Sequence, residues 1–147
     1  MKIIIVDLQY NPGMSKITSF LWRWGLALLM MAAIFGFSSI PSVDMPNFGL
    51  LDFLVKKGGH AFGYGLLALC YLLGLKGDSK GINLRWTYAA WTLAALYSAS
   101  DEFHQSFVPG RYPSMTDVLI DSLGAAVALF LAYKFYRQKR PALWTGH

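Results

Sequence analysis

Four long apolar stretches limit what this chain can fold into, because each approaches the length of a membrane-spanning helix. They cover approximately residues 17–37, 61–75, 86–99 and 118–133. A helix needs roughly 20 mostly apolar residues to cross the hydrocarbon core of a bilayer. The first stretch has this length, and the second and fourth reach it with their flanks. The third reaches it only if Asp101, Glu102 and Gln105 continue the helix into the membrane interface or into a protein interior.

Composition also indicates a membrane protein, since charged residues make up only 14% of the 147 residues. Soluble domains carry roughly 25%. Lipid cannot hydrogen-bond the backbone, so spanning segments are helices or strands of closed barrels, and the apolar stretches lack the alternation of barrel strands. We therefore predict an all-α fold, a four-helix transmembrane bundle forming a single domain over residues 1–147. The expected helices cover about residues 17–38, 58–76, 84–106 and 116–137.

The distribution of basic residues predicts the orientation of the bundle. Of the 13 Lys and Arg residues, all except Lys56, Lys57 and Arg111 lie near the N-terminus, the second connection or the C-terminus. Cytoplasmic loops of membrane proteins carry the excess of Lys and Arg. We therefore expect a multi-pass protein of the cell membrane with both termini in the cytoplasm. The net charge of +5 comes without a nucleic-acid-binding motif, so no nucleic-acid partner is expected.

Most acidic residues gather at the opposite, outward end, together with three polar motifs. The first motif, KKGGHAFGY, places Lys57, His60 and Tyr64 on one helix face, because they are three and four residues apart. Gly59 and Gly63 in the same motif are small enough to admit a close helix neighbour. We expect another helix to pack there.

The second motif, SASDEFHQ, closes the third expected helix. Ser98, Asp101 and Gln105 share one face of that helix, and Glu102 lies three residues before Gln105. A carboxylate in contact with lipid is unfavourable by several kcal/mol. These groups should therefore face the interior of the bundle and find polar partners.

The third motif, PGRYPS followed by TDVLIDSLGAA, covers the third connection and the start of the fourth helix. Thr116 is a candidate N-cap, and Asp117 suits the positive end of a helix dipole. The Arg111 guanidinium can bind a protein carboxylate or a ligand phosphate through two hydrogen bonds. We expect Arg111 and Asp117 to meet Lys57 and Glu102 at the outward end of the bundle.

The pattern KxxHxxxY followed by SxxDExxQxFxPxRxxSxxDVxxDxxGA, over residues 57–125, resembles the VanZ-like family. The segment FSSIP at residues 37–41 is similar to the end of that family's first helix. One position differs, since Asp121 stands where the family often has asparagine. The resemblance implies a four-helix integral membrane protein linked to low-level resistance to the glycopeptide teicoplanin. It implies no settled biochemical activity.

Two functional interpretations of the polar residues are open. They either tie the helix ends together as a structural network, or they form a site at the outer leaflet that binds or modifies a lipid or cell-envelope component. In the second case His60 and Glu102 are the candidate catalytic groups, because histidine titrates near neutral pH. The candidate ligand-binding residues are Lys57, Tyr64, Asp101, Gln105, Arg111, Asp117 and Asp121.

Neither a metal nor a cofactor is expected, because the sequence contains no HExxH or CxxC spacing and only one cysteine. The expected partner is a membrane lipid or an envelope intermediate. A non-catalytic component that binds a membrane protein partner or a second copy of the chain is the alternative. The sequence leaves open whether the protein is an enzyme.

Overall fold

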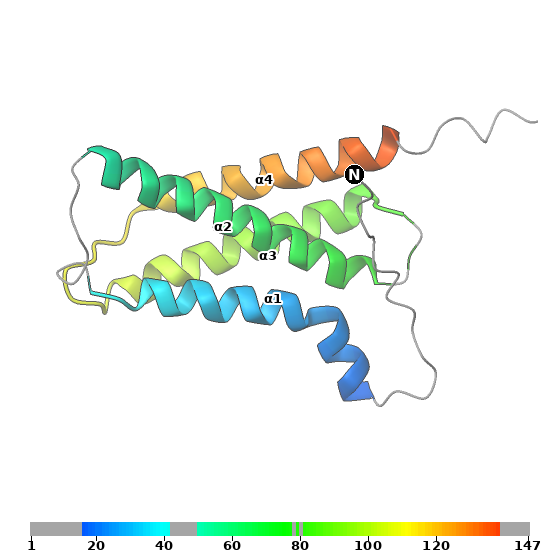
Figure 1. The fold of residues 1–147 in the computed structure, drawn as a ribbon, viewed down its shortest axis with the longest axis horizontal. Coiled ribbons are helices and arrows are strands. Elements are labelled where there is room, and N and C mark those ends of the chain that lie inside the picture. Colours follow the sequence, from blue (N-terminus) through cyan, green and yellow to red (C-terminus); the bar gives the residue numbers. More distant parts are fainter. Residues whose placement is uncertain (1–15, 42–49, 78, 80, 139–147) are drawn as a thin grey trace, which may run out of the picture.

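The structure of the chain is a computed structural model that describes residues 16–41, 50–77, 79 and 81–138. These residues form four helices, α1 (Lys16–Ser38), α2 (Leu50–Lys76), α3 (Leu84–Gln105) and α4 (Met115–Gln138). The helices run along the length of the molecule in alternating directions (Figure 1). The prediction of an all-α, four-helix fold is therefore confirmed.

The observed helix bounds agree with the expected ranges to within one residue, except at the start of α2. That helix begins at Leu50, whereas the sequence predicted a start near residue 58. The segment LLDFLVKK contains apolar residues at helical spacing and no proline, which favours a helix. Each glycine of the Gly58–Gly59 pair weakens a helix by only about 1 kcal/mol relative to alanine. The helix therefore continues through both glycines.

Three of the four helices are long and apolar enough to cross a membrane, over the ranges Thr18–Ser38, Lys56–Lys76 and Met115–Gln138. The remaining helix, α3, is too polar to meet this requirement. It packs against the other three helices, and its buried residues are Ala90, Ala94, Ser98, Asp101, Glu102 and Gln105. The helix thus continues through these polar residues, and of the two alternatives, the membrane interface and a protein interior, the structure shows the protein interior. The chain is a multi-pass membrane protein.

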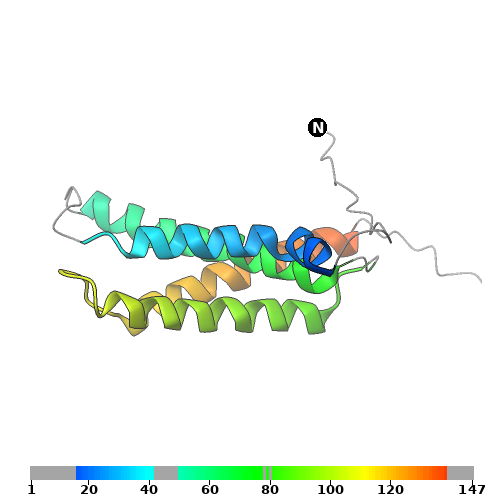
Figure 2. The same cartoon turned by 90° about the horizontal axis from the view of Figure 1, so that it is seen from below.

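The apolar core lies between α2, α3 and α4. Leu67 and Ala68 of α2, Ala94 of α3, and Ala125 and Leu129 of α4 have almost no exposed surface. Figure 2 shows α1 and α2 above α3, with α1 in front, nearest the viewer. Many large apolar side chains on the outer surfaces remain exposed in the isolated chain, as expected of helices that face lipid.

Glycines allow α2 and α4 to approach each other closely. A Cβ atom at Gly124 would overlap the backbone of Ala61, and one at Gly65 would lie 3.3 Å from the Cβ of Ala128. The prediction that Gly59 and Gly63 serve this role is wrong, since no heavy atom of a neighbour would lie within 4 Å of a Cβ there. These two glycines are two residues from Ala61 and Gly65 respectively, which is about 200° around a helix and therefore the opposite face.

One end of the bundle is rich in polar side chains, and we call it the polar end. It contains the end of α1, the start of α2, the end of α3 and the start of α4, on the left of Figure 1. The start of α1, the end of α2, the start of α3 and the end of α4 lie at the other end. The chain direction thus brings the three polar motifs together.

Candidate functional site

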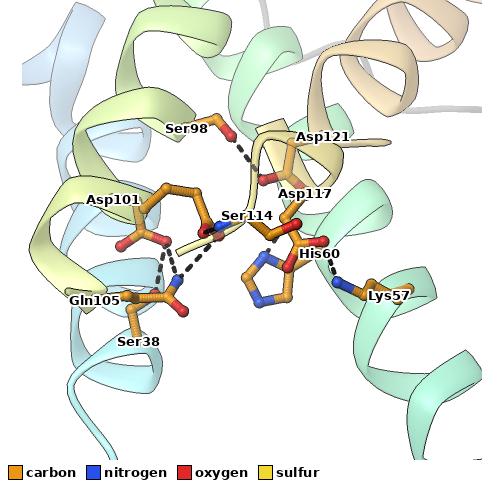
Figure 3. A network of polar contacts seen from close by, with 10 residues as sticks. Ser38, Lys57, His60, Ser98, Asp101, Gln105, Ser114, Asp117 and Asp121 are labelled. Carbon is orange, nitrogen blue, oxygen red and sulfur yellow. Dashed lines mark hydrogen bonds and ion pairs between the residues drawn. The ribbon is translucent and has the colours of Figure 1, made fainter. Parts of the chain in front are cut away.

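A cluster of polar side chains from all four helices occupies the polar end, and Figure 3 shows it from close by, without Tyr64. We call it the polar cluster. It consists of Ser38, Lys57, His60, Tyr64, Ser98, Asp101, Glu102, Gln105, Ser114, Asp117 and Asp121. The α3 members lie three or four residues apart, so they project from one face into the bundle, as the sequence predicted.

Asp101 connects α3 to α1. Its Oδ2 atom accepts a hydrogen bond of 2.7 Å from the Ser38 hydroxyl and one of 3.1 Å from the Gln105 amide. The Oδ1 atom of the same carboxylate is buried and has no hydrogen-bond partner. The hydroxyl of Tyr64, a residue that is 1% exposed, is likewise buried and unpaired.

Glu102 connects α3 to the segment that leads into α4. Its Oε2 atom accepts a hydrogen bond of 2.8 Å from the backbone N–H of Ser114, and its Oε1 atom lies 3.4 Å from the Gln105 amide nitrogen. Ser114 is the last residue before α4, and its carbonyl accepts from the N–H of Asp117. Glu102 therefore fixes where α4 begins. Thr116, the expected N-cap, lies inside the first turn of α4 instead, because the helix begins at Met115.

Asp121 connects α4 to α3 and faces α2. Its Oδ2 atom accepts a hydrogen bond of 2.7 Å from the hydroxyl of Ser98, which is fully buried. The Nδ1 atom of His60 lies 3.7 Å from Asp121 Oδ1, which is close enough for an ion pair but too long for a hydrogen bond. Both of these atoms are buried without a hydrogen-bond partner.

An ion pair between Lys57 and Asp117 lies at the rim of the polar cluster and joins α2 to α4. The two side chains are 26% and 18% exposed, so this pair is partly accessible from outside. An ion pair with this exposure contributes about 1 kcal/mol or less. Its position matters more than its strength, because Lys57 lies one turn before His60, whose side chain is 27% exposed. We call this partly exposed edge of the polar cluster its opening.

Arg111 holds the third connection against the end of α1. Its Nε and one terminal nitrogen donate hydrogen bonds of 3.1 Å to the carbonyl oxygens of Ile40 and Phe37. The last carbonyls of a helix lack partners within the helix, and a guanidinium can satisfy two of them at once. The sequence predicted that Arg111 binds a protein carboxylate or a ligand phosphate. The structure instead shows it bonded to two backbone carbonyls.

Three members of the polar cluster, Ser38, Ser98 and Ser114, were not among the candidate site residues, although Ser98 was placed on the same helix face as Asp101. Ser38 and Ser114 both make hydrogen bonds to buried carboxylates. Ser38 could have been found from its position, because it is the polar residue at the end of the first apolar stretch. A hydroxyl at the end of a helix is more readily interpreted as a helix cap than as part of a site. Ser114 contributes its backbone N–H, a group that no side-chain motif can reveal.

The chemistry of the polar cluster is determined by four buried atoms without hydrogen-bond partners. They are His60 Nδ1, Tyr64 Oη, Asp101 Oδ1 and Asp121 Oδ1. Two of them are carboxylate oxygens, which accept hydrogen bonds, and the phenol oxygen can donate or accept. Within the described residues, no group of three or more His, Cys, Asp or Glu side chains has the arrangement of a metal site.

Comparison with known proteins identifies a family. The sequence profile of the VanZ/LLP1 family matches residues 1–137, which include α1, α2, α3 and nearly all of α4. No curated protein and no solved structure matches the chain.

Proposed function

The chain belongs to the VanZ/LLP1 family, and on that premise we propose that its polar cluster binds or modifies the polar part of a lipid or cell-envelope component at the outer leaflet. The observation that supports this proposal most directly is the set of four buried polar atoms without partners. A buried donor or acceptor without a hydrogen bond is unfavourable by about 1–3 kcal/mol. A ligand that supplies the missing hydrogen bonds would remove that cost.

The orientation in this proposal follows from the basic residues. The end of the bundle opposite the polar cluster carries Lys76, Arg85, Lys134 and Arg137. The positive-inside tendency assigns that end to the cytoplasm and the polar end to the exterior. The polar cluster would then face envelope components from the outer leaflet.

The proposed roles follow from depth and chemistry. Tyr64, Asp101 and Asp121 hold the oxygens that lack a hydrogen bond, so the ligand would contact them directly, and at Asp121 it would share the carboxylate with His60, whose Nδ1 lies 3.7 Å away. Where a proton is transferred, His60 and Glu102 are the acid–base groups. The residues that position the site and border its opening are Lys57, Gln105, Arg111 and Asp117. A link to teicoplanin resistance is part of this proposal.

The test replaces the two carboxylates that carry unpaired oxygens. In a host whose glycopeptide or envelope-stress phenotype depends on the protein, Asp101→Asn and Asp121→Asn should abolish that phenotype. Asparagine keeps the side-chain size and can still accept the serine hydrogen bonds, so protein level in the membrane should be retained. Ser100→Ala, an exposed position on the other face of α3, is the matched control.

Membrane abundance and the unfolding midpoint of each purified variant separate loss of function from loss of fold. An unchanged phenotype with both asparagine variants, at normal abundance, would contradict the proposal.

A second candidate function is that of a non-catalytic component that binds a protein partner. It is favoured by the hydrogen bonds through which Asp101, Glu102 and Asp121 join helices to one another. In that case Asp117→Asn should be tolerated, and the protein should copurify with another envelope protein. Retained copurification together with a retained phenotype in the Asp101→Asn and Asp121→Asn variants would favour this second function over the first.

A further inference from the structure

An apolar groove runs along the outer surface between α2 and α4. Its volume is about 660 Å³. Small residues that allow the two helices to approach form part of its lining, among them Ala61, Gly65, Gly124 and Ala128, and larger apolar side chains such as Leu66 and Val127 complete it. The lining is almost entirely apolar, so a hydrocarbon chain is chemically suited to it.

The length of the groove matches the depth of one lipid leaflet. On α4 its lining extends from Ile120 to Ala132. At about 1.5 Å per residue this corresponds to roughly 18 Å along the helix. The hydrocarbon core of a bilayer is about 30 Å thick, so one leaflet accounts for about half of that. One chain of a lipid can therefore lie in the groove along its length.

The groove ends beside the polar cluster. Ala61, which lines the groove on α2, follows His60, and Ile120, which lines it on α4, precedes Asp121. His60 is partly exposed at this point, while Asp121 is fully buried. A lipid whose chain occupies the groove would therefore have its head group next to the opening of the cluster.

The unpaired atoms of the cluster indicate which head groups fit. Asp101 Oδ1 and Asp121 Oδ1 are buried acceptors, and both belong to side chains less than 4% exposed. Ammonium and hydroxyl groups donate hydrogen bonds to such oxygens. A phosphate oxygen only accepts hydrogen bonds, so it cannot satisfy these carboxylate oxygens.

We infer that the ligand is a membrane lipid with one chain in the α2–α4 groove and a head group that donates hydrogen bonds, a primary ammonium or sugar hydroxyls, to the polar cluster at Asp121, the carboxylate next to the groove residue Ile120. This inference rests on the proposed function and narrows its ligand. The ammonium and the sugar hydroxyls have one property in common, which is that both donate hydrogen bonds, through N–H and O–H groups respectively.

Photocrosslinking of the full-length protein in phosphatidylcholine nanodiscs tests the inference. Three probes carry the same diazirine-labelled acyl chain and differ in the head group: phosphatidylethanolamine, phosphatidylcholine and a glycosyl diacylglycerol. Labelled peptides are mapped by mass spectrometry. The ethanolamine probe, the glycosyl probe or both should label residues of the α2–α4 groove several-fold more than the choline probe, which has no N–H or O–H donor. Stronger labelling by the ethanolamine probe would identify the donor as an ammonium, and stronger labelling by the glycosyl probe would identify it as a hydroxyl.

A second groove in the same molecule provides the internal control. It lies between α3 and α4, toward the end opposite the polar cluster, has a volume of about 310 Å³ and is lined by residues that include Thr87, Ala126 and Tyr133. It should be labelled equally by all three probes. Val127→Trp should reduce labelling of the α2–α4 groove, whereas Ala126→Trp, the adjacent residue that lines the control groove, should not.

Equal labelling of both grooves by all three probes would overturn the inference, because it would indicate nonspecific lipid contact. Protection of the α2–α4 groove from every probe would also overturn it, since another protein or a second copy would then cover the groove. Asp121→Asn should abolish the preference for donor head groups. If the Asp101→Asn and Asp121→Asn variants lose the cellular phenotype while the wild type shows no probe preference, the proposed function stands and the lipid assignment fails.

Discussion

Ser98 shows at the scale of one residue how the polar cluster is stabilised. The side chain is fully buried, and its hydroxyl donates to Asp121 across the α3–α4 contact. Two residues along the same helix, the exposed Ser100 donates only to the carbonyl of Tyr97 in its own helix. The two serines are therefore a natural pair for comparing a buried interhelical hydrogen bond with a local one.

Ser98→Ala should lower the free energy of unfolding by about 1–3 kcal/mol, because it leaves a buried carboxylate oxygen without its donor. Ser100→Ala should change the free energy of unfolding by about 0.5 kcal/mol or less, as is usual at an exposed position. Unfolding of the purified protein in detergent, followed by circular dichroism, measures both. Equal midpoints for the two variants would show that the hydrogen bond between Ser98 and Asp121 adds no stability.

Arg111→Lys should loosen the end of α1, although it preserves the charge. A lysine ammonium lacks the planar fork that reaches two carbonyl oxygens at once, and the lost charged hydrogen bond corresponds to about 1.5–3 kcal/mol. Hydrogen exchange should accelerate at the backbone N–H groups of Ser39 and Ile40, which bond within that terminus. Arg85→Lys, at the opposite end of the bundle, is the control. Unchanged exchange at Ser39 and Ile40 would contradict the proposed capping role.

Residue spacing predicted part of this site. The helical period placed Ser98, Asp101 and Gln105 on one face, and the structure shows that face buried. The individual partners could not be predicted, because they depend on how each helix is rotated and shifted against its neighbours. Arg111 illustrates this limit, since its hydrogen-bond acceptors are backbone carbonyls more than 70 residues away in the sequence.

At the scale of elements, the close contact between α2 and α4 depends on glycine, most strictly at Gly124. A Cβ at Gly124 would overlap the backbone of Ala61, and backbone cannot move aside as a flexible side chain can. A Cβ at Gly63 meets only open space. The two glycines lie on facing helices but differ in whether a neighbour occupies the space beside them.

Gly124→Ala should destabilise the protein by about 1–3 kcal/mol, the usual range for overpacking. Gly63→Ala should be neutral or stabilise α2 by up to about 1 kcal/mol, because alanine favours helix more than glycine does. Thermal unfolding in detergent measures both variants. A stable Gly124→Ala protein would show that α2 and α4 can separate without a large cost.

Helix bounds were predicted well where the sequence contains clear breakers and poorly where it does not. The second helix was expected to begin near residue 58, yet α2 begins at Leu50. The small residues of α2 were identified as a contact surface, but on the wrong face. The direction in which a helix presents its glycines depends on its partner, and a single sequence does not specify which partner lies on which side.

At the scale of the whole molecule, alternating helix direction separates a polar end from a basic end (Figure 1). The proposed orientation makes a direct prediction for two exposed positions, Ser79 between α2 and α3 and Tyr112 between α3 and α4. In a Cys70→Ser background, Tyr112→Cys should react with a membrane-impermeant maleimide in intact cells. Ser79→Cys should react only after permeabilisation. The reverse pattern would place the polar cluster in the cytoplasm.

The burial of α3 has a consequence for how the chain is made. Ser114 donates a hydrogen bond to Glu102, and Asp121 accepts one from Ser98. Both partners are synthesised after α3 itself. Acidic side chains in a helix that stands alone in lipid oppose insertion. During translation, α3 is therefore expected to stay beside α1 and α2 or within the insertion machinery until α4 emerges, so that the last two helices enter the bilayer as one unit.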